Sequence, residues 1–467
     1  MQFTQIIFLI GFLPVSYYLY KTLSRRKVSN KTLNMVLLGI SLLYYAFGSL
    51  KSLFVLVFLL LWNWVGASAI VQADTPQKKR QSLWLCVGID LLVLFLYRYF
   101  DAWISGFFGL FGQHPTLPEF IMPIGLSFYL FSSLSYVFDV YYGKAEPCSL
   151  LDFGLFAAFF GRVNMGPIGH YAKFRHQLDH HPISRKLANR GTALFLQGLF
   201  FKVLLADNFG LLFQALFGNT SWLGNLMLGF AYFFELYFDF AGYSRMARGL
   251  GCLFGFEIPR NFNRPYQALS VQDFWRRWHI SLTDWFREYV YIPLGGNRVN
   301  QKRWIFNILV VWALTGIWHG TTWCFVLWGL YEGGLILLEK FRLNAILEKW
   351  PKPLRHAYLI AAQLLGWTLF SSTSLMEALS RLGRYVGIGI SGLADSASLF
   401  YLYGSLVLFA LAVFICTPYP ARIKEWINER LHVNRGVLGA IGYGFCFLLS
   451  LAFLIAQSSQ TFLYAGF

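Results

Sequence analysis

The chain has 467 residues, of which 57% are hydrophobic and only 13% are charged, whereas a typical soluble domain carries about 25% charged residues. This composition excludes an ordinary soluble protein and indicates a chain embedded in lipid. The formal net charge of +17 is also found in nucleic-acid binders, but here the basic residues fall in short clusters between apolar runs, so nucleic acid is not an expected partner.

The basic clusters indicate which loops face the cytoplasm, because lysine and arginine are enriched on that side of a membrane protein. The candidate loops are 21–27, 75–80, 162–190, 260–303, 340–355 and 421–430. Membrane lipids are therefore the solvent of this chain, and we expect a multi-pass protein of the inner (plasma) membrane.

The first apolar run, Ile6 to Tyr20, follows only MQFTQ, which lacks the basic start of a cleaved signal peptide. We expect it to be retained as a membrane-spanning helix. Apolar runs of the right length then recur along the whole chain. The expected spans are 5–21, 33–48, 53–72, 82–98, 119–141, 191–217, 223–249, 303–318, 321–340, 356–374, 399–419 and 434–456.

This pattern predicts an all-α polytopic membrane protein with about 11 to 13 transmembrane helices and both termini outside. Residues 149–160 are too short to span, and residues 251–303 mix charged and aromatic residues between apolar helices. We expect both stretches to form re-entrant or interfacial elements. An outside segment is expected between Leu375 and Ser398.

Two histidines are distinguished by a preceding tryptophan. His319 follows Trp318 after about 16 apolar residues, a helical rise of about 24 Å from the cytoplasmic side, and GIWHGTTW predicts a break between two spans there. We interpret His319 as a general base at the bottom of a funnel that opens to the outside, in preference to a structural role. For His279 after Trp278, an interfacial and a catalytic role are equally compatible with the residues.

Glu235 and Asp239 lie four residues apart on one face of the expected helix 223–249. Unpaired carboxylates in a span are costly, so they need partners or a cavity. Arg245 or an arginine of 260–303 is the expected partner, and an ion pair that fixes helix packing is the favoured interpretation. A proton relay in a transporter or flippase is the rival from another functional class.

Ser270 and Asp273 predict a short helix that starts at Val271. The following arginines are able to hold the phosphates of an acyl-CoA or an acylated carrier, although ordinary positive-inside bias explains them equally well. No serine-hydrolase, zinc-protease, Walker or Rossmann motif occurs in a plausible context, and the six cysteines are scattered. We therefore expect no metal site and no bound cofactor.

The stretch NFNRPYQALSVQDFWRRWHISLTDWFREYVYIPLGGNR, residues 261–298, resembles the membrane-bound O-acyltransferase (MBOAT) family, and within it the bacterial alginate O-acetyltransferase-like branch. Flanking pieces agree with this resemblance: SYVFDVYYG (135–143), YFDFAGYS (237–244), FGFEIPRNFNRPY (254–266) and WHGTTWCFVLWGLYEG (318–333). The resemblance covers essentially the whole chain.

The resemblance implies a single transmembrane domain over 1–467 around a central funnel and tunnel. Its parts are N-terminal helices (1–118), a catalytic core (119–340) and C-terminal helices with a tail (341–467). It further implies that His319 is the catalytic histidine and that His279 lies beside the acyl-transfer channel. The donor-binding residues expected in this context are Arg276, Arg277, Trp278 and Trp318.

The last residues, TFLYAGF, match an aromatic tail in relatives, whose tyrosine is thought to carry the acyl group. In this chain that residue is Tyr464, between Phe462 and Phe467. The alternative is a terminal aromatic belt at the membrane interface.

The predicted function is transfer of an acetyl group from cytoplasmic acetyl-CoA for O-acetylation of an extracytoplasmic polysaccharide such as alginate or cellulose. Peptidoglycan O-acetylation or teichoic acid D-alanylation by the same mechanism are the alternatives, and YIPLGGN (291–297) favours O-acetylation. Gly161, His170 and Arg245 depart from the family pattern and leave the acceptor polymer open. Because no serine nucleophile is visible, we expect a periplasmic partner of the SGNH esterase type, working with the polysaccharide biosynthesis machinery.

Overall fold

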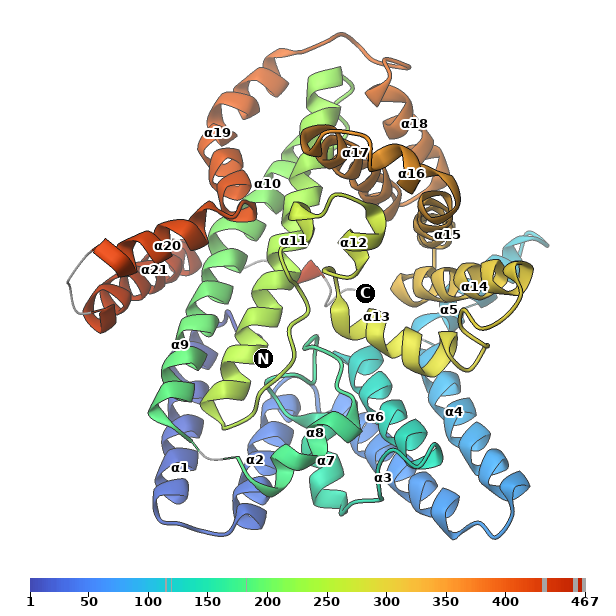
Figure 1. Ribbon diagram of the computed structural model, residues 1–467, viewed down its shortest axis with the longest axis vertical. Coiled ribbons are helices and arrows are strands. Elements are labelled where there is room, and N and C mark those ends of the chain that lie inside the picture. Colours follow the sequence, from blue (N-terminus) through green and yellow to red (C-terminus); the bar gives the residue numbers. More distant parts are fainter. Residues whose placement is uncertain (114–115, 119, 182, 431–434, 457–460, 464–467) are drawn as a thin grey trace. The chain divides into compact units, whose positions relative to one another are not determined.

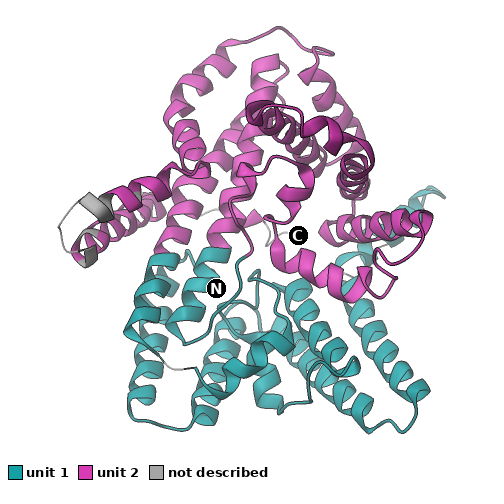
Figure 2. Cartoon of the chain, viewed as in Figure 1, with its two compact units in different colours: residues 1–195, 244–260 teal, residues 196–243, 261–467 magenta. Residues whose placement is uncertain are grey.

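The computed structural model describes the whole chain except residues 114–115, 119, 182, 431–434, 457–460 and 464–467. Its described residues form helices and connecting segments without any strand (Figure 1), which confirms the predicted all-α class. Two compact units are present: Met1–Phe195 with Ser244–Arg260, and Leu196–Tyr243 with Asn261–Phe467 (Figure 2). The division of the sequence at residues 118 and 340 stays a prediction.

The first unit is a set of helices, several of which begin at a serine or threonine cap. The side chains of Ser29, Ser49, Thr75 and Ser149 each accept a hydrogen bond from the backbone three residues on. The helices of this unit are α1 (Leu13–Arg25, preceded by the π-helical turn Ile7–Phe12), α2 (Asn30–Ala46), α3 (Leu50–Gln72), α4 (Pro76–Arg98), α5 (Phe100–Gly109), α6 (Leu126–Tyr141), α7 (Leu150–Ala158), α8 (Tyr171–Asp179), α9 (Arg185–Phe200) to Phe195, and α11 (Trp222–Leu253) from Ser244.

Helix α4 starts earlier than the sequence predicted. It begins at Pro76, so the basic residues 78–80 lie in its first turns and not in a loop. The physical reason is local, because Thr75 caps the helix and proline is favoured in a first helical turn. Hydropathy marked only the apolar part of this helix.

Helix α6 starts later than predicted, at Leu126, although residues 120–126 before and at its start are apolar. Gly125 stands before it with φ of 77°, and a β-carbon at that glycine would lie 2.4 Å from the carbonyl oxygen of Val163. The backbone there therefore packs against the buried non-helical segment 159–170. This segment follows the short helix α7, and the re-entrant or interfacial element near 149–160 stays a prediction.

The second unit contains longer spans and a group of short helices between them. Its elements are the rest of α9 with the π-helical turn Phe201–Ala206, α10 (Asp207–Leu216), α11 to Tyr243, the 3-10 turn Pro265–Gln267, α12 (Val271–Trp275), α13 (Ile280–Phe286) with the π-helical turn Arg287–Tyr291, α14 (Gln301–His319), α15 (Trp323–Leu338) with the π-helical turn Glu339–Leu343, α16 (Asn344–Leu347), α17 (Lys352–Ser371), α18 (Leu375–Tyr385), α19 (Ser396–Cys416), α20 (Tyr419–Arg430) and α21 (Arg435–Ala456).

Six helical stretches in the described part of the chain are both long and apolar enough to cross a membrane: Ile7–Arg25, Leu50–Gln72, Pro76–Arg98, Arg185–Leu216, Ser396–Cys416 and Gly439–Ala456. A chain with several such helices is a polytopic membrane protein. The larger number of spans expected from hydropathy stays a prediction.

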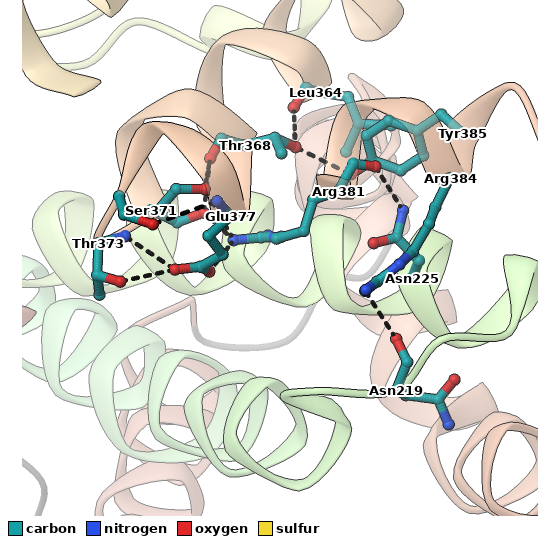
Figure 3. A network of polar contacts seen from close by, with 12 residues as sticks. Asn219, Asn225, Leu364, Thr368, Ser371, Thr373, Glu377, Arg381, Arg384 and Tyr385 are labelled. Carbon is teal, nitrogen blue, oxygen red and sulfur yellow. Dashed lines mark hydrogen bonds and ion pairs between the residues drawn. The ribbon is translucent and has the colours of Figure 1, made fainter. Parts of the chain in front are cut away.

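The segment predicted to lie outside contains a helix that hydropathy did not indicate. Helix α18 turns Arg381 inward, where its side chain is 3% exposed and Nη1 donates to Ser371 Oγ over 3.0 Å (Figure 3). Asn225 of α11 donates to the Arg381 carbonyl, and Arg384 donates to the Asn219 carbonyl. This polar network fastens α18 to helices α11 and α17.

Candidate active site

His319 ends helix α14 and lies inside the second unit. Its side chain is 3% exposed, and its ring centroid lies 5.1 Å from that of Trp328 and 5.0 Å from that of Phe370. The chain is non-helical from Gly320 to Thr322 before α15 begins. The predicted break after the histidine is therefore confirmed.

Glycines hold α14 and α15 close together beside this break. A β-carbon on Gly316 would lie 2.3 Å from the carbonyl oxygen of Phe325, and one on Gly329 would lie 2.3 Å from the carbonyl oxygen of Trp312. Real β-carbons do not approach that closely, so only glycine permits this backbone contact. The close contact fixes the direction in which His319 leaves its helix.

His279 lies between the short helices α12 and α13 in an unusual backbone conformation. Its φ of 42° and ψ of 50° are left-handed, which is uncommon for a residue other than glycine. Asn261 supports this turn from the side, because its carbonyl accepts from Ile280 N over 3.0 Å and its Oδ1 accepts from Ser281 N over 3.2 Å. Such strain persists only where the surroundings over-determine it, and it is concentrated at functional sites.

Helix α12 is set at its start by two groups. Ser270 Oγ accepts from Asp273 N over 3.1 Å, so the prediction that a short helix begins at Val271 is confirmed. The buried carboxylate of Glu339 accepts from the backbone N–H groups of Val271 and Gln272 over 2.6 and 2.9 Å. This second cap was not predictable from the sequence, because Glu339 lies 68 residues after Val271.

Both histidines line one cavity of about 210 Å³. Trp278 also lines it. Trp318 lies between the two histidines, and its ring centroid is 6.1 Å from that of His279 and 4.7 Å from that of His319. The full lining is Trp275, Trp278, His279, Leu282, Thr283, Phe286, Arg287, Tyr291, Ile308, Val311, Trp312, Thr315 and His319. The structure thus brings together two histidines that are 40 residues apart in the sequence.

The cavity lining follows helical spacing, which is the signal that sequence reasoning left unused. Ile308, Trp312, Thr315 and His319 recur every three or four residues on α14, the spacing of one helix face. Leu282, Thr283, Phe286, Arg287 and Tyr291 do the same on α13 and the turn after it.

The predicted donor-binding residues divide into two groups. Trp278 and Trp318 are buried beside the histidines as described, whereas Arg276 is exposed and does not line the cavity. Arg277 Nε donates to Asp273 Oδ1 over 2.9 Å. The arginine that does line the cavity is Arg287, which sequence reasoning missed and which also pairs with Asp284 over 3.0 Å.

Asp239 has a different partner from the one predicted. Its Oδ1 accepts from Lys202 Nζ over 2.7 Å, so the expectation of Arg245 or an arginine of 260–303 is wrong for this carboxylate. Lys202 Nζ also lies 2.6 Å from Asp207 Oδ1, and all three side chains are buried. Lys202 escaped notice because it lies in the middle of an apolar helix, 37 residues before Asp239.

The C-terminal tail is held by the same charges. Leu463 N donates to Asp239 Oδ2 over 3.0 Å, and Lys202 Nζ donates to the Thr461 carbonyl over 3.3 Å. The Phe462 ring is 2% exposed and lies 4.7 Å from Lys202 Nζ. We call Lys202, Asp207, Asp239 and residues 461–463 the tail anchor. Tyr464 and Phe467 lie outside the described residues.

Fold and site together define a polytopic membrane protein with a small cavity that two histidines line. The sequence profile of the MBOAT, membrane-bound O-acyltransferase family, matches residues 126–380, which include the whole cavity lining. The chain is 31% identical to the probable alginate O-acetylase AlgI of Azotobacter vinelandii, over 100% of both chains. It therefore belongs to the membrane-bound O-acyltransferase family and is a membrane O-acyltransferase.

Other relatives act on other polymers. The chain is 31% identical to the peptidoglycan O-acetyltransferase of Helicobacter pylori over 99% of this chain and 96% of the relative. It is 30% identical to the teichoic acid D-alanyltransferase of Streptococcus thermophilus over 53% of this chain and 68% of the relative. Membership of an enzyme family favours the acyltransferase interpretation over the transporter or flippase.

Proposed function

We propose that the enzyme takes an acetyl group from acetyl-CoA on the cytoplasmic side and passes it on for O-acetylation of an extracytoplasmic polysaccharide. The observation that carries this proposal is the cavity lined by both His279 and His319. At about 210 Å³ it is smaller than the roughly 300–1,000 Å³ of sites for drug-sized ligands. A two-carbon acyl group is the kind of ligand that such a volume favours.

In the proposed reaction His319 acts as general base. Its ring takes the proton from an acceptor hydroxyl as that oxygen attacks the thioester carbonyl carbon. The carbon–sulfur bond breaks, and the CoA thiolate leaves and takes up a proton. Base catalysis of this type contributes about 10²- to 10⁴-fold in rate. His279 and Trp278 form part of the walls that hold the acetyl group in place, and Trp318 supports both histidine rings from outside the lining.

The charged part of the donor is assigned to arginines. Arg287 lines the cavity and has an exposed side chain, which suits a residue that meets a phosphate at the cavity mouth. Arg276 and Arg277 lie 11 and 10 residues before Arg287 in the chain and are proposed to extend this basic surface.

The test of this function is acetyl transfer by a His319→Ala variant. Purified enzyme is mixed with labelled acetyl-CoA and acceptor polymer in the presence of its partner proteins, and incorporation of label is measured. We expect a loss of at least about 100-fold with normal yield and folding. His180→Ala, which removes an exposed histidine, is the matched control and should transfer at the wild-type rate. More than a few per cent of activity in His319→Ala would refute the role.

We further propose that Tyr464 carries the acetyl group between the cavity and the partner. The support is positional: the preceding residues 461–463 are fixed at the tail anchor in the interior of the unit. In this relay the phenol oxygen attacks the thioester, His319 takes the phenol proton, and the aryl ester later transfers its acetyl group to a sugar hydroxyl and regenerates the phenol. A phenol with pKa near 10 needs such a base at neutral pH.

Tyr464→Phe separates the relay from an aromatic belt, because it keeps the ring and removes only the hydroxyl. We expect polymer acetylation to fall below about 1% of wild type, in keeping with loss of a covalent step. Tyr443→Phe on α21 is the matched control. Wild-type acetylation by Tyr464→Phe would refute the relay and leave the acyltransferase proposal standing.

A further inference from the structure

A second cavity, of about 630 Å³, lies in the first unit between the end of α1 and the start of α9. Three cationic side chains line it: Lys21 and Arg25 of α1 and Arg185 of α9. The remaining lining is Tyr17, Ser24, Ile183, Ser184, Ala188, Asn189, Thr192 and Leu253. It therefore combines cations with hydroxyl and amide donors, and it contains no carboxylate.

Its positive charges are not neutralised within the described part of the chain. None of the three cations forms an ion pair there. The acidic residues nearest in sequence to the lining residues Ile183 and Leu253 have other partners, with Asp179 bonded to Arg175 and Glu257 to Arg190. Three like charges around one hollow repel each other, and a bound anion would relieve that repulsion. The hydroxyl and amide groups supply hydrogen bonds suited to a phosphate.

The place of this cavity indicates where its anion comes from. Lys21 and Arg25 end the candidate span Ile7–Arg25, and Arg185 begins the candidate span Arg185–Leu216. Charged residues at the ends of two spans are expected at the membrane surface. Basic pockets between spans on the cytoplasmic side bind anionic lipid head groups. Tyr17, Ala188 and Leu253 add apolar wall, and the Lys21 Nζ atom lies 5.2 Å from the centre of the Tyr17 ring.

We propose that this cavity is a binding site for the phosphate of an anionic phospholipid of the cytoplasmic leaflet. The cations contact the phosphate, the hydroxyl and amide groups hold its free oxygens, and the apolar wall receives the start of the acyl chains. The site belongs to the first unit alone, and it does not rest on the proposed acetyl transfer.

The experiment compares lipid binding by the full-length protein and two charge variants. Lys21→Gln/Arg25→Gln/Arg185→Gln removes the cavity cations, and Lys78→Gln/Lys79→Gln/Arg80→Gln removes three exposed charges of another basic cluster. Detergent-solubilised protein is titrated with phosphatidylglycerol, or with phosphatidylcholine of the same acyl chains, and bound lipid is counted by native mass spectrometry.

We expect the cavity variant to bind phosphatidylglycerol about 100-fold more weakly, from about fivefold for each cation, while the control variant and phosphatidylcholine binding change by less than about threefold. Equal weakening in both variants would reduce the effect to net charge and overturn the site. So would unchanged binding in the cavity variant.

Two further measurements distinguish a lipid site from a site for a soluble anion, and a loss of charge from a loss of folding. Inorganic phosphate that displaces no phosphatidylglycerol supports a lipid site, whereas saturable phosphate binding without lipid binding overturns it in favour of a soluble anion. If the triple variant does not fold, Lys21→Gln should lose binding about fivefold and Lys21→Arg should restore it. A lack of rescue by arginine would overturn the role of charge.

Discussion

The cavity lined by His279 and His319 lies in the same unit as the tail anchor. The buried polar side chains of these two regions have opposite kinds of surroundings. The two histidines are surrounded by aromatic rings and close glycine contacts, and Arg287 is the single permanently charged residue in the described lining. The tail anchor is a cluster of buried charges, in which Lys202 Nζ lies 2.6 Å from Asp207 and 2.7 Å from Asp239.

This difference reflects two separate requirements of a membrane enzyme, proton exchange at one site and firm attachment of a chain segment at the other. A general base, the role proposed for His319, must exchange protons, and a lining with few permanent charges suits that role. A chain terminus must instead be held against its own conformational entropy, and buried charges with backbone hydrogen bonds supply a directional hold. We expect the two regions to respond differently to substitution.

The largest structural effect is expected at the tail anchor. Lys202→Met removes the cation and leaves Asp207 and Asp239 buried without it, which should destabilise the protein by about 3–5 kcal/mol. The measurement is thermal unfolding of purified protein in detergent, with polymer acetylation as a second readout. Loss of acetylation is expected as well, because the tail residues 461–463 lose one of their attachments.

Coupling within the anchor is tested by adding Asp239→Asn. The double variant should recover part of the stability that Lys202→Met loses, since it removes one uncompensated charge, and a coupling energy of at least about 1 kcal/mol is expected for contacting residues. Strictly additive effects would show that the cluster does not act as a unit.

A smaller effect is expected where helices α14 and α15 touch beside His319. Gly316→Ala places a β-carbon 2.3 Å from the carbonyl oxygen of Phe325, and overpacking of this kind costs about 1–3 kcal/mol. The same substitution at Gly334 of α15 meets nothing within 4 Å and should be neutral or slightly stabilising, as alanine is the better helix former. Unfolding temperatures and transfer rates of the two variants should diverge, and equal values would contradict the packing argument.

The smallest effect is expected at the start of α12. Ser270→Ala removes one cap and should cost about 0.5–1 kcal/mol, because the hydrogen bonds that the backbone N–H groups of Val271 and Gln272 donate to Glu339 remain. Ser374→Ala removes the same kind of cap from α18 and serves as the control. Both should lower the unfolding temperature slightly, but only Ser270→Ala should slow acetyl transfer, and equal transfer rates would show that α12 does not set the position of His279.

Much of the architecture was predictable because its causes are local. Hydropathy indicated the apolar helices, Ser270 indicated the start of α12, and the glycine-flanked Trp-His pair indicated the break after α14. The start of α4 was not predicted correctly, since hydropathy does not distinguish charged residues in a capped first helical turn from charged residues in a loop. Helix α18 was missed for a related reason, because its inward face carries Arg381.

The amino-acid sequence by itself determined that this chain is an all-α membrane protein, and it indicated two histidines as candidates for a chemical role, because hydrophobic periodicity and short motifs act over a few residues. Only the tertiary structure decided that His279 and His319 line one cavity, that Arg287 lines it while Arg276 does not, and that Asp239 pairs with Lys202. Those outcomes depend on which helix faces pack together. Packing is set by close contacts such as that of Gly316 with Phe325, and the residues that form such contacts are not separated by a regular interval in the sequence.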